Sequence, residues 1–352
     1  MANDQTRPPP AGPSFVSAQQ VADRAGVSRS AVSRAFTPGA SIGRETRERV
    51  IKAAEELGYQ VNDLARGLLA RQSRLVGLVG TRPDLGFRAH LVAALAKALI
   101  ARGSVPVLIN TGDTPQEVAA AQGILLGYRA EATIVISGSP PAPMLEGARR
   151  NGQPVILIGR TEPDLDGVLA DNAAAGDEAA ERLLALSAGG PVGLIGARSG
   201  TQSIAEREDA FRRAVGRRGG DVIFAQGAEA DYAGGQEAAR TLFAEARPKA
   251  LYAVNDLLAM GAMDHARLGL GLTIPGDLAV IGFDDVPQAG WEAYALTTFQ
   301  QDPETMAAQA IALLVRRQAD PAAPPLTLRV PARLVPRRSA RSGHPMLEGD
   351  RS

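Results

Sequence analysis

The sequence predicts a small all-α unit at the N-terminus followed by a much larger α/β unit. Near the start, two short helical segments are separated by a tight turn and followed by a third helix. From Leu75 onward, short β-branched runs alternate with amphipathic segments, a pattern typical of parallel sheets covered by helices on both faces. The 352 residues are also too many for one compact core, so at least two domains are expected.

The first predicted helix covers residues 18–25. Ser17 and Gln20 have the spacing of a capping box, in which the serine hydroxyl accepts the Gln20 N–H and the glutamine side chain reaches back. Gly26 can adopt the positive φ that ends a helix tightly. These residues therefore predict a short helix with a sharp stop.

The second helix is expected over residues 29–36 with Ser28 as its N-cap, and the third over residues 44–57. The second helix leaves hydrogen-bonding and cationic side chains outward: Arg29, Ser30, Ser33 and Arg34. Such a face suits entry into a DNA major groove, so the three helices predict a helix-turn-helix unit. The alternative is a small helical bundle that binds nothing.

Charge is distributed unevenly along a chain whose net charge is zero. Residues 1–71 carry ten Lys or Arg and seven Asp or Glu, whereas residues 72–336 carry 24 basic and 29 acidic residues. A slightly basic front on an acidic body is consistent with a DNA-binding head attached to a sensor.

The predicted α/β body has two sets of strand-like runs. They are residues 75–80, 105–111, 133–137, 155–159, 192–196, 222–226, 250–255 and 278–283. Helical segments between them include residues 91–102, 116–126, 174–186, 205–217 and 257–268. About 260 residues of this kind suggest two lobes, with a ligand held beyond the carboxyl ends of the strands.

Several function classes are disfavoured. Cysteine is absent, and the three histidines lie far apart, so we expect no metal site, no cofactor and no catalytic triad. Phosphate-binding and hydrolase motifs are missing too, which argues against an enzyme. The proline-rich start resembles no secretory signal and no apolar run approaches a membrane span, so we expect a cytoplasmic, nucleoid-associated protein without a membrane partner.

The N-terminal residues resemble the headpiece of the lac repressor (LacI/GalR) family of transcription regulators. The matching segments are 21–28 (VADRAGVS), 32–34 (VSR), 46–50 (TRERV), 57–59 (LGY), Asn62 and 65–68 (ARGL). The resemblance implies that Arg29 and Ser30 read bases and that Arg34 meets base edges or phosphate. The full DNA-binding set that we expect is Ser17, Ser28, Arg29, Ser30, Ser33, Arg34, Asn62, Arg66 and Leu68.

The resemblance also implies a hinge helix within residues 61–73, whose Leu68 wedges into the minor groove. A segment this short is not a stable helix alone, so it would fold only on DNA; the alternative for Leu68 is an ordinary contact between domains. Two residues depart from the family pattern. Ala31 replaces a usual threonine, which removes a possible DNA contact, and Gly43 replaces a capping serine.

The body resembles the periplasmic-binding-protein-like (type I) sensor of the same family. The matching segments are 170–172 (ADN), 207–211 (REDAF), 253–256 (AVND), 274–277 (IPGD), 280–285 (VIGFDD), 296–298 (LTT) and 337–339 (RRS). The predicted division is a disordered tail (1–14), a helix-turn-helix headpiece (15–60), the hinge (61–73), an effector-binding and dimerisation domain, the sensor (74–339), and a second disordered tail (340–352). Within the sensor, the likeness implies one lobe of 74–171 plus 301–325 and another of 172–300 plus 326–339.

Three family effector positions carry over as Arg207, Asn255 and Asp284. An arginine fork suits a carboxylate or paired hydroxyls, and Asn and Asp suit sugar hydroxyls. Two of the three have structural alternatives: Asp284 could cap a turn, and Asn255 could cap a helix.

Two further effector candidates are less constrained by the pattern. Gly159 stands where relatives often place Asp, so Arg160 could face an anionic group or simply lie on the surface. Trp291, the only tryptophan, could stack on a sugar face or pack in the core.

The implied function is a repressor of carbohydrate or other carbon-source genes that an inducer releases from DNA. Paired recognition helices imply a palindromic operator and a homodimer, or a tetramer. The alternatives are a regulator that needs a co-repressor or a phosphoprotein, and a sugar-processing enzyme fused to a DNA-binding head.

Overall fold

The computed structural model describes residues 15–37, 39–61, 73–111, 117, 123–124, 127–136 and 142–341. The chain forms two units, Met1–Ser73 and Arg74–Ser352. The expected hinge residues Asn62, Arg66 and Leu68 lie outside the described residues, as do the expected tail 1–14, residues 342–352 of the second tail and most of the expected helix over 116–126.

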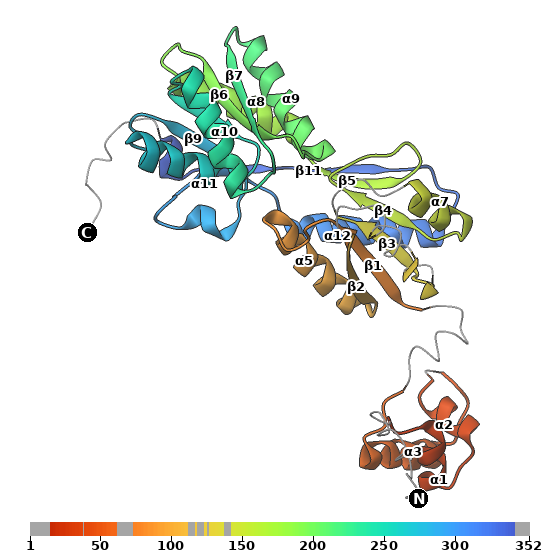
Figure 1. Ribbon diagram of the computed structural model, residues 1–352. Helices are drawn as coiled ribbons and strands as arrows, with labels where there is room; N and C mark the ends of the chain where they lie inside the picture. The colour runs from red at the N-terminus through yellow and green to blue at the C-terminus, as the bar shows by residue number, and fades with distance from the viewer. Residues whose placement is uncertain are drawn as a thin grey trace, which may run out of the picture. The chain divides into compact units, whose positions relative to one another are not determined.

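The first unit holds three helices, α1 (Ala18–Ala25), α2 (Arg29–Ala35) and α3 (Arg44–Leu57), at the predicted places (Figure 1). The capping box at Ser17 is present, and Gly26 ends α1 with a φ of 65°. Ser28 caps α2 by accepting the N–H of Ala31. Gly43 begins α3 without a side-chain cap. Local capping chemistry therefore sets the ends of these helices.

A small core joins the three helices. Its buried side chains are Val21, Ala22, Ala25, Val32, Ala35, Val50, Ala53 and Ala54. Phe36 and Tyr59 pack against this core with their ring centroids 5.7 Å apart. Because the core uses one face of each helix, the outer face of α2 remains in solvent.

The second unit contains two lobes, and the first is built on a wholly parallel six-stranded sheet. In spatial order the strands are β11 (Thr327–Val330), β5 (Asp166–Ala170), β4 (Val155–Ile158), β3 (Ala132–Val135), β1 (Leu75–Gly80) and β2 (Val105–Asn110). Helices α5 (Phe87–Arg102) and α12 (Pro303–Ala319) share a core on one face, and α7 (Ala142–Arg150) covers the other.

The second lobe repeats this plan with one antiparallel edge, where β10 pairs with β12. Its order is β12 (Arg333–Val335), β10 (Thr297–Gln300), β9 (Ala279–Asp284), β8 (Ala250–Ala253), β6 (Val192–Ala197) and β7 (Val222–Gly227). Its helices are α8 (Asn172–Leu186), α9 (Gln202–Arg217), α10 (Tyr232–Glu245) and α11 (Asp256–Asp264), the last continued by a π-helical turn, η1 (His265–Gly269).

The chain crosses between the lobes three times, as predicted, but the third crossing lies elsewhere. The prediction assigned residues 326–339 to the second lobe, and this is wrong for β11. Thr327 pairs with Gly167 and Val330 with Ala170 in the first sheet, so the crossing follows β11. A four-residue strand has no pattern that selects its sheet, and the pairing partner alone decides.

Sequence patterns also missed the short strands β5, β10, β11 and β12. Each has three to five residues and mixes apolar with polar residues or glycine, so it lacks the apolar run by which the equally short strands β3, β4 and β8 were predicted. At the other end of the sensor, the 3-10 turn η3 (Arg338–Ala340) includes Ala340, which packs against the core of the second lobe.

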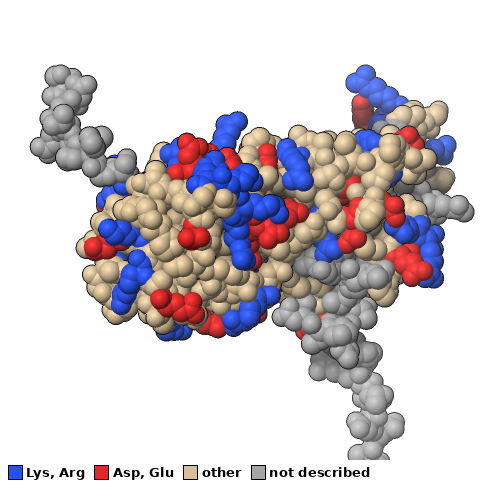
Figure 2. Space-filling model, turned by 90° about the horizontal axis from the view of Figure 1, so that it is seen from above, with Lys and Arg blue, Asp and Glu red and all other residues tan. Residues whose placement is uncertain are grey.

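Charges on the sensor are mixed. On the face drawn in Figure 2, Lys and Arg side chains lie among Asp and Glu side chains, without a large surface of one sign. Asp177, for example, pairs with both Arg217 and Arg218. Within the described part of the chain, no helix is long and apolar enough to cross a membrane.

The packing of α10 on α11 generates a stability prediction. A Cβ added to Gly235 would overlap the carbonyl oxygen of Leu258, which is backbone and cannot yield easily. We expect Gly235→Ala to lower the free energy of unfolding by about 1–3 kcal/mol through overpacking, measured by urea denaturation. The matched control is Gly216→Ala, where an added Cβ meets nothing within 4 Å on an exposed turn of α9. This change should raise stability by about 0.5–1 kcal/mol, and equal effects of both substitutions would contradict the packing argument.

Candidate functional site

A cavity of about 510 Å³ lies where the carboxyl ends of both sheets meet. Its walls come from the ends of strands β1, β3, β4, β6, β7, β8, β9 and β10 or the segments that follow them, and from the N-terminal parts of α5, α9, α11 and α12. Four of the predicted effector residues line it: Arg160, Arg207, Asn255 and Asp284. The cavity is therefore placed where open α/β sheets hold ligands.

Arg207 is the most firmly held side chain of this site. Its Nε donates to Asn172 Oδ1 at 3.0 Å, and its Nη1 donates to the carbonyl oxygen of Val254 at 2.9 Å. The guanidinium also lies 3.7 Å from the ring centroid of Phe283, a cation–π contact. The remaining nitrogen, Nη2, has a 3.5 Å contact with Ser203 Oγ. One side of the guanidinium is thus used for structure, and the other borders the cavity.

Asp284 ends β9 and faces Arg207 at 3.3 Å between Oδ1 and Nη1. Gln301 donates to the same oxygen at 2.6 Å. The backbone of Asp284 has a φ of 124°, a conformation that side chains other than glycine rarely adopt. Burial raises the pKa of this carboxyl, and the positive charge of Arg207 opposes the rise. The carboxylate is therefore part of a network and not a simple turn cap.

A second acid, Asp256, lies fully buried behind Asp284. It accepts the Val286 N–H at 2.9 Å and the Thr298 hydroxyl at 2.5 Å. Burial raises its pKa well above the ordinary value, and the negative charge of Asp284 raises it further. The structure thus holds two acids whose protonated forms are favoured by their surroundings.

Asn255 has the helix-capping role weighed from sequence, and its role in effector binding stays a prediction. Its Oδ1 caps α11 by accepting the Leu258 N–H at 2.8 Å, and its Nδ2 donates to the Ala230 carbonyl oxygen at 2.9 Å. The side chain nevertheless lines the cavity. A ligand would therefore meet an amide whose orientation is already set.

Arg160 is mostly buried, with 16% of its side chain exposed, so it does not lie on the open surface. It forms an ion pair with Glu162. Gly159, just before it, has a φ of 75° and puts no side chain into the cavity.

Trp291 is not where the sequence analysis placed it. It lies outside the cavity, and 57% of it is exposed, so neither the stacking role nor the core role holds. The reason is the 3-10 turn η2 (Pro287–Gly290), which separates it from Asp284.

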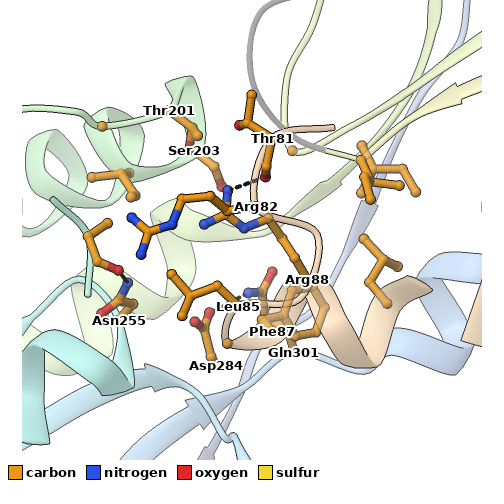
Figure 3. Close-up of a pocket in the computed structure, with 18 of the residues that line it drawn as sticks. Thr81, Arg82, Leu85, Phe87, Arg88, Thr201, Ser203, Asn255, Asp284 and Gln301 are labelled. Atoms are coloured by element: carbon orange, nitrogen blue, oxygen red, sulfur yellow. Dashed lines mark hydrogen bonds between the residues drawn. The ribbon is translucent and has the colours of Figure 1, made fainter. Parts of the chain in front are cut away.

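Other cavity residues escaped the sequence analysis. The most prominent are Arg82 and Arg88, which come from the loop after β1 and the first turn of α5 (Figure 3). Thr201 and Ser203 border the cavity at the start of α9. Their only sequence signal is their position after a strand and at a helix start, which many exposed residues share. Among the described residues, no cluster of His, Asp or Glu side chains could hold a metal ion.

The headpiece presents the predicted face of α2. Arg29, Ser30, Ser33 and Arg34 are all exposed. Arg34 Nε donates to the Ser30 carbonyl oxygen at 3.3 Å. The hydroxyls of Ser17 and Ser28 serve as helix caps, which fixes where α1 and α2 begin. Ala31 is buried, so a larger residue there would have to fit beneath the helix.

The buried acids generate a pH prediction. A carboxyl whose pKa is raised on folding favours the folded state at low pH, and this contribution is lost as pH rises above about 4. We expect Asp256→Asn to flatten the fall in stability above that pH, measured as urea midpoints across a pH series. The control is Asp277→Asn, because hydrogen bonds from Thr273 lower the pKa of Asp277 and confine its effect to more acidic pH. An unchanged slope in Asp256→Asn would contradict the assignment.

Comparisons with known proteins agree with this geometry. Residues 18–62 match the model of the lacI family of bacterial regulatory proteins, and residues 190–340 match a periplasmic binding protein-like domain. The HTH-type transcriptional repressors PurR of Salmonella paratyphi B and of Proteus mirabilis are each 28% identical over 331 residues, covering 92% of this chain and 97% of theirs.

Three solved structures are similar as well. A complex of the transcriptional regulator CelR with cellobiose is 28% identical, with a TM-score of 0.68 over 92% of this chain and 99% of that one. The lac repressor bound to ONPG is 25% identical, with a TM-score of 0.82 over 93% and 100%. The lac repressor dimer bound to operator and the anti-inducer ONPF is 24% identical, with a TM-score of 0.82 over 94% and 100%. By these matches the chain is a DNA-binding transcription regulator with a small-molecule effector, built from the DNA-binding domain of the lacI family and a periplasmic binding protein-like domain, and its relatives are transcriptional repressors and not enzymes.

Proposed function

We propose that this regulator represses carbohydrate or other carbon-source genes and is released from its operator by an inducer bound in the cavity. The observation that carries the proposal is the cavity between two lobes in a chain that also has a helix-turn-helix unit. Because its target is chromosomal DNA, we propose that it acts in the cytoplasm, at the nucleoid.

The face of α2 supports the DNA-binding part. Arg29 and Arg34 have no carboxylate partner among the ion pairs of the described headpiece, so both charges are available to phosphate or base edges. Ser30 and Ser33 add hydroxyl groups on the same exposed face. For Asn62, Arg66 and Leu68 the DNA contacts remain a proposal based on family resemblance.

Contacts across the cavity support the coupling of ligand to DNA. Arg82 of the first lobe pairs with Asp231 of the second at 3.1 Å, and Gln202 Nε2 donates to Thr161 Oγ1 at 3.1 Å. Three chain crossings leave the lobes free to rotate about a hinge. A ligand that changes these contacts would alter the operator complex by about 1–3 kcal/mol, the usual size of such coupling.

Two alternatives differ in specific ways. A co-repressor or phosphoprotein partner would tighten operator binding, whereas an inducer weakens it, so titrating the operator complex with metabolites separates them. A fused sugar-processing enzyme is not favoured, because the matching relatives are transcriptional repressors. The similar CelR complex with cellobiose supports a sugar-like effector.

Exposed apolar side chains support a homodimer, which a palindromic operator needs. In the first lobe they are Ile100 on α5, and Val105 and Leu108 on the edge strand β2. In the second lobe they are Leu268, which is 86% exposed, and Trp291. The turn η1 is joined to the segment after Trp291 by Arg267, which donates to the Ala293 carbonyl oxygen at 2.6 Å. Edge strands and apolar patches of this kind are normally covered in a stable protein.

Two substitutions separate the proposed activities. We expect Arg34→Ala to weaken operator binding by about 1–3 kcal/mol and to leave effector binding intact. We expect Arg207→Ala to remove the effector response while operator binding persists. Fluorescence anisotropy on an operator selected from genomic fragments measures both. The control is Arg24→Ala, whose guanidinium is already paired with Glu56 at 2.7 Å. Loss of both activities in both variants would show that the division of roles is wrong.

The dimer proposal has its own test. Leu268→Glu would place a carboxylate in the proposed contact, where burying an unpaired charge is costly. We expect the mass measured by light scattering to fall from dimer toward monomer. Ile51→Glu, at a partly exposed apolar position on α3, should leave the mass unchanged. A Leu268→Glu protein that stays dimeric would exclude this face from the interface.

A further inference from the structure

The cavity contains four arginines, and one of them has no carboxylate partner among the described residues. Arg82 pairs with Glu229 and Asp231, Arg160 with Glu162, and Arg207 with Asp284. Arg88 donates to the Thr81 carbonyl oxygen at 2.9 Å and forms no ion pair with any described residue. The side chain is only partly accessible to solvent. A partly buried guanidinium that forms no ion pair is a candidate to bind an anionic ligand.

Arg88 also lies beside a second cation. Figure 3 shows Arg82 and Arg88 extending into the same part of the cavity, with Asp284 and Gln301 on one side and Ser203 and Thr201 on another. Burial lowers the pKa of Arg88, and the positive charge of Arg82 lowers it further. Two guanidinium groups so arranged repel each other, and an anion between them would replace repulsion by two charge-assisted contacts.

Nearby acids offset this only in part. The negative charges of Asp284, Asp84 and Glu229 act to raise the pKa of Arg88, but none of these carboxylates forms an ion pair with it. Glu229 and Asp231 already share Arg82, and Asp284 is engaged by Arg207 and Gln301. Gly159, at the end of β4, contributes no carboxylate. An anion in the cavity would thus find the guanidinium of Arg88 without an ion pair, whereas the two acids that line the cavity, Glu229 and Asp284, are already paired.

The remaining walls define the rest of the ligand. The lining offers two kinds of side chain: Ser203, Asn255 and Gln301 can form hydrogen bonds, and Leu85, Phe87 and Met306 are apolar. A hydroxylated ring or chain has polar edges and an apolar face, which suits both kinds.

We infer that the effector is an anionic sugar derivative, a hydroxylated carbon skeleton that carries a carboxylate or phosphate, and that Arg88 together with Arg82 holds its anionic group. This inference rests on the proposed function, since it specifies the ligand class of the same cavity. Arg207, Asn255 and Gln301 face the hydroxylated part.

The test compares probes that differ in charge. Thermal shift and calorimetry on the full chain use D-gluconate, glucose 6-phosphate and inorganic phosphate against D-glucose and chloride, at equal millimolar concentration and ionic strength. We expect the anionic probes to stabilise the wild type and glucose not to. Arg88→Gln should weaken binding of the best anionic probe by about tenfold to a hundredfold, the loss typical of a charge-assisted hydrogen bond.

Two further variants make the result specific. Arg88→Lys keeps the charge and should retain part of the affinity, whereas Arg182→Gln removes an exposed arginine of α8 and should change nothing. Unchanged melting temperature and operator binding in the ligand-free Arg88→Gln protein show that it is folded.

Each remaining outcome overturns the inference. These are a wild type that binds no anionic probe, one that binds glucose as well as gluconate, and anion binding that survives Arg88→Gln. None of these outcomes would contradict the proposed regulation of transcription. That proposal fails separately if the protein binds no genomic fragment more tightly than random duplex DNA.

Discussion

The cavity wall that the second lobe supplies depends on one buried guanidinium, that of Arg207. Arg207 connects α9 to α8 through Asn172, to β8 through the Val254 carbonyl and to β9 through Asp284. A charge buried this deeply is stable only with well-placed partners, so removing any one of them is costly. These partners of Arg207 lie at the carboxyl ends of the strands of the second sheet. One of them, Asp284, has a positive φ, a backbone conformation that residues other than glycine seldom adopt. The arrangement also leaves one nitrogen of the guanidinium beside the cavity.

The first lobe supplies the opposite kind of electrostatics. Whereas Arg207 is surrounded by acceptors, Arg88 is held by one carbonyl oxygen and faces another cation. The first lobe contributes the guanidinium of Arg88, which forms no ion pair with a described residue. The second lobe contributes Arg207 and its hydrogen-bonded partners, whose positions are fixed. A ligand in the cavity would contact both lobes at once. Such contacts are needed for a small molecule to change the orientation of one lobe relative to the other.

The headpiece is determined mainly by interactions between residues that are close in the sequence. Its helices begin and end at residues with local capping roles, Ser17, Gly26 and Ser28, and its core is filled by small apolar side chains. Because these effects act within a few residues, the three helices and the outward face of α2 are predictable from the amino-acid sequence. The same holds for the long buried strands, whose apolar runs are unambiguous.

The sequence alone determined the class of both units, the helix ends of the headpiece and the four cavity residues Arg160, Arg207, Asn255 and Asp284. Only the tertiary structure decided the sheet that β11 joins, the outward position of Trp291 and the meeting of Arg82 with Arg88. The physical reason is the distance along the chain over which each interaction acts. Caps, turns and apolar periodicity act over a few residues, whereas a strand's partner and a cavity's charge depend on segments far apart in the chain.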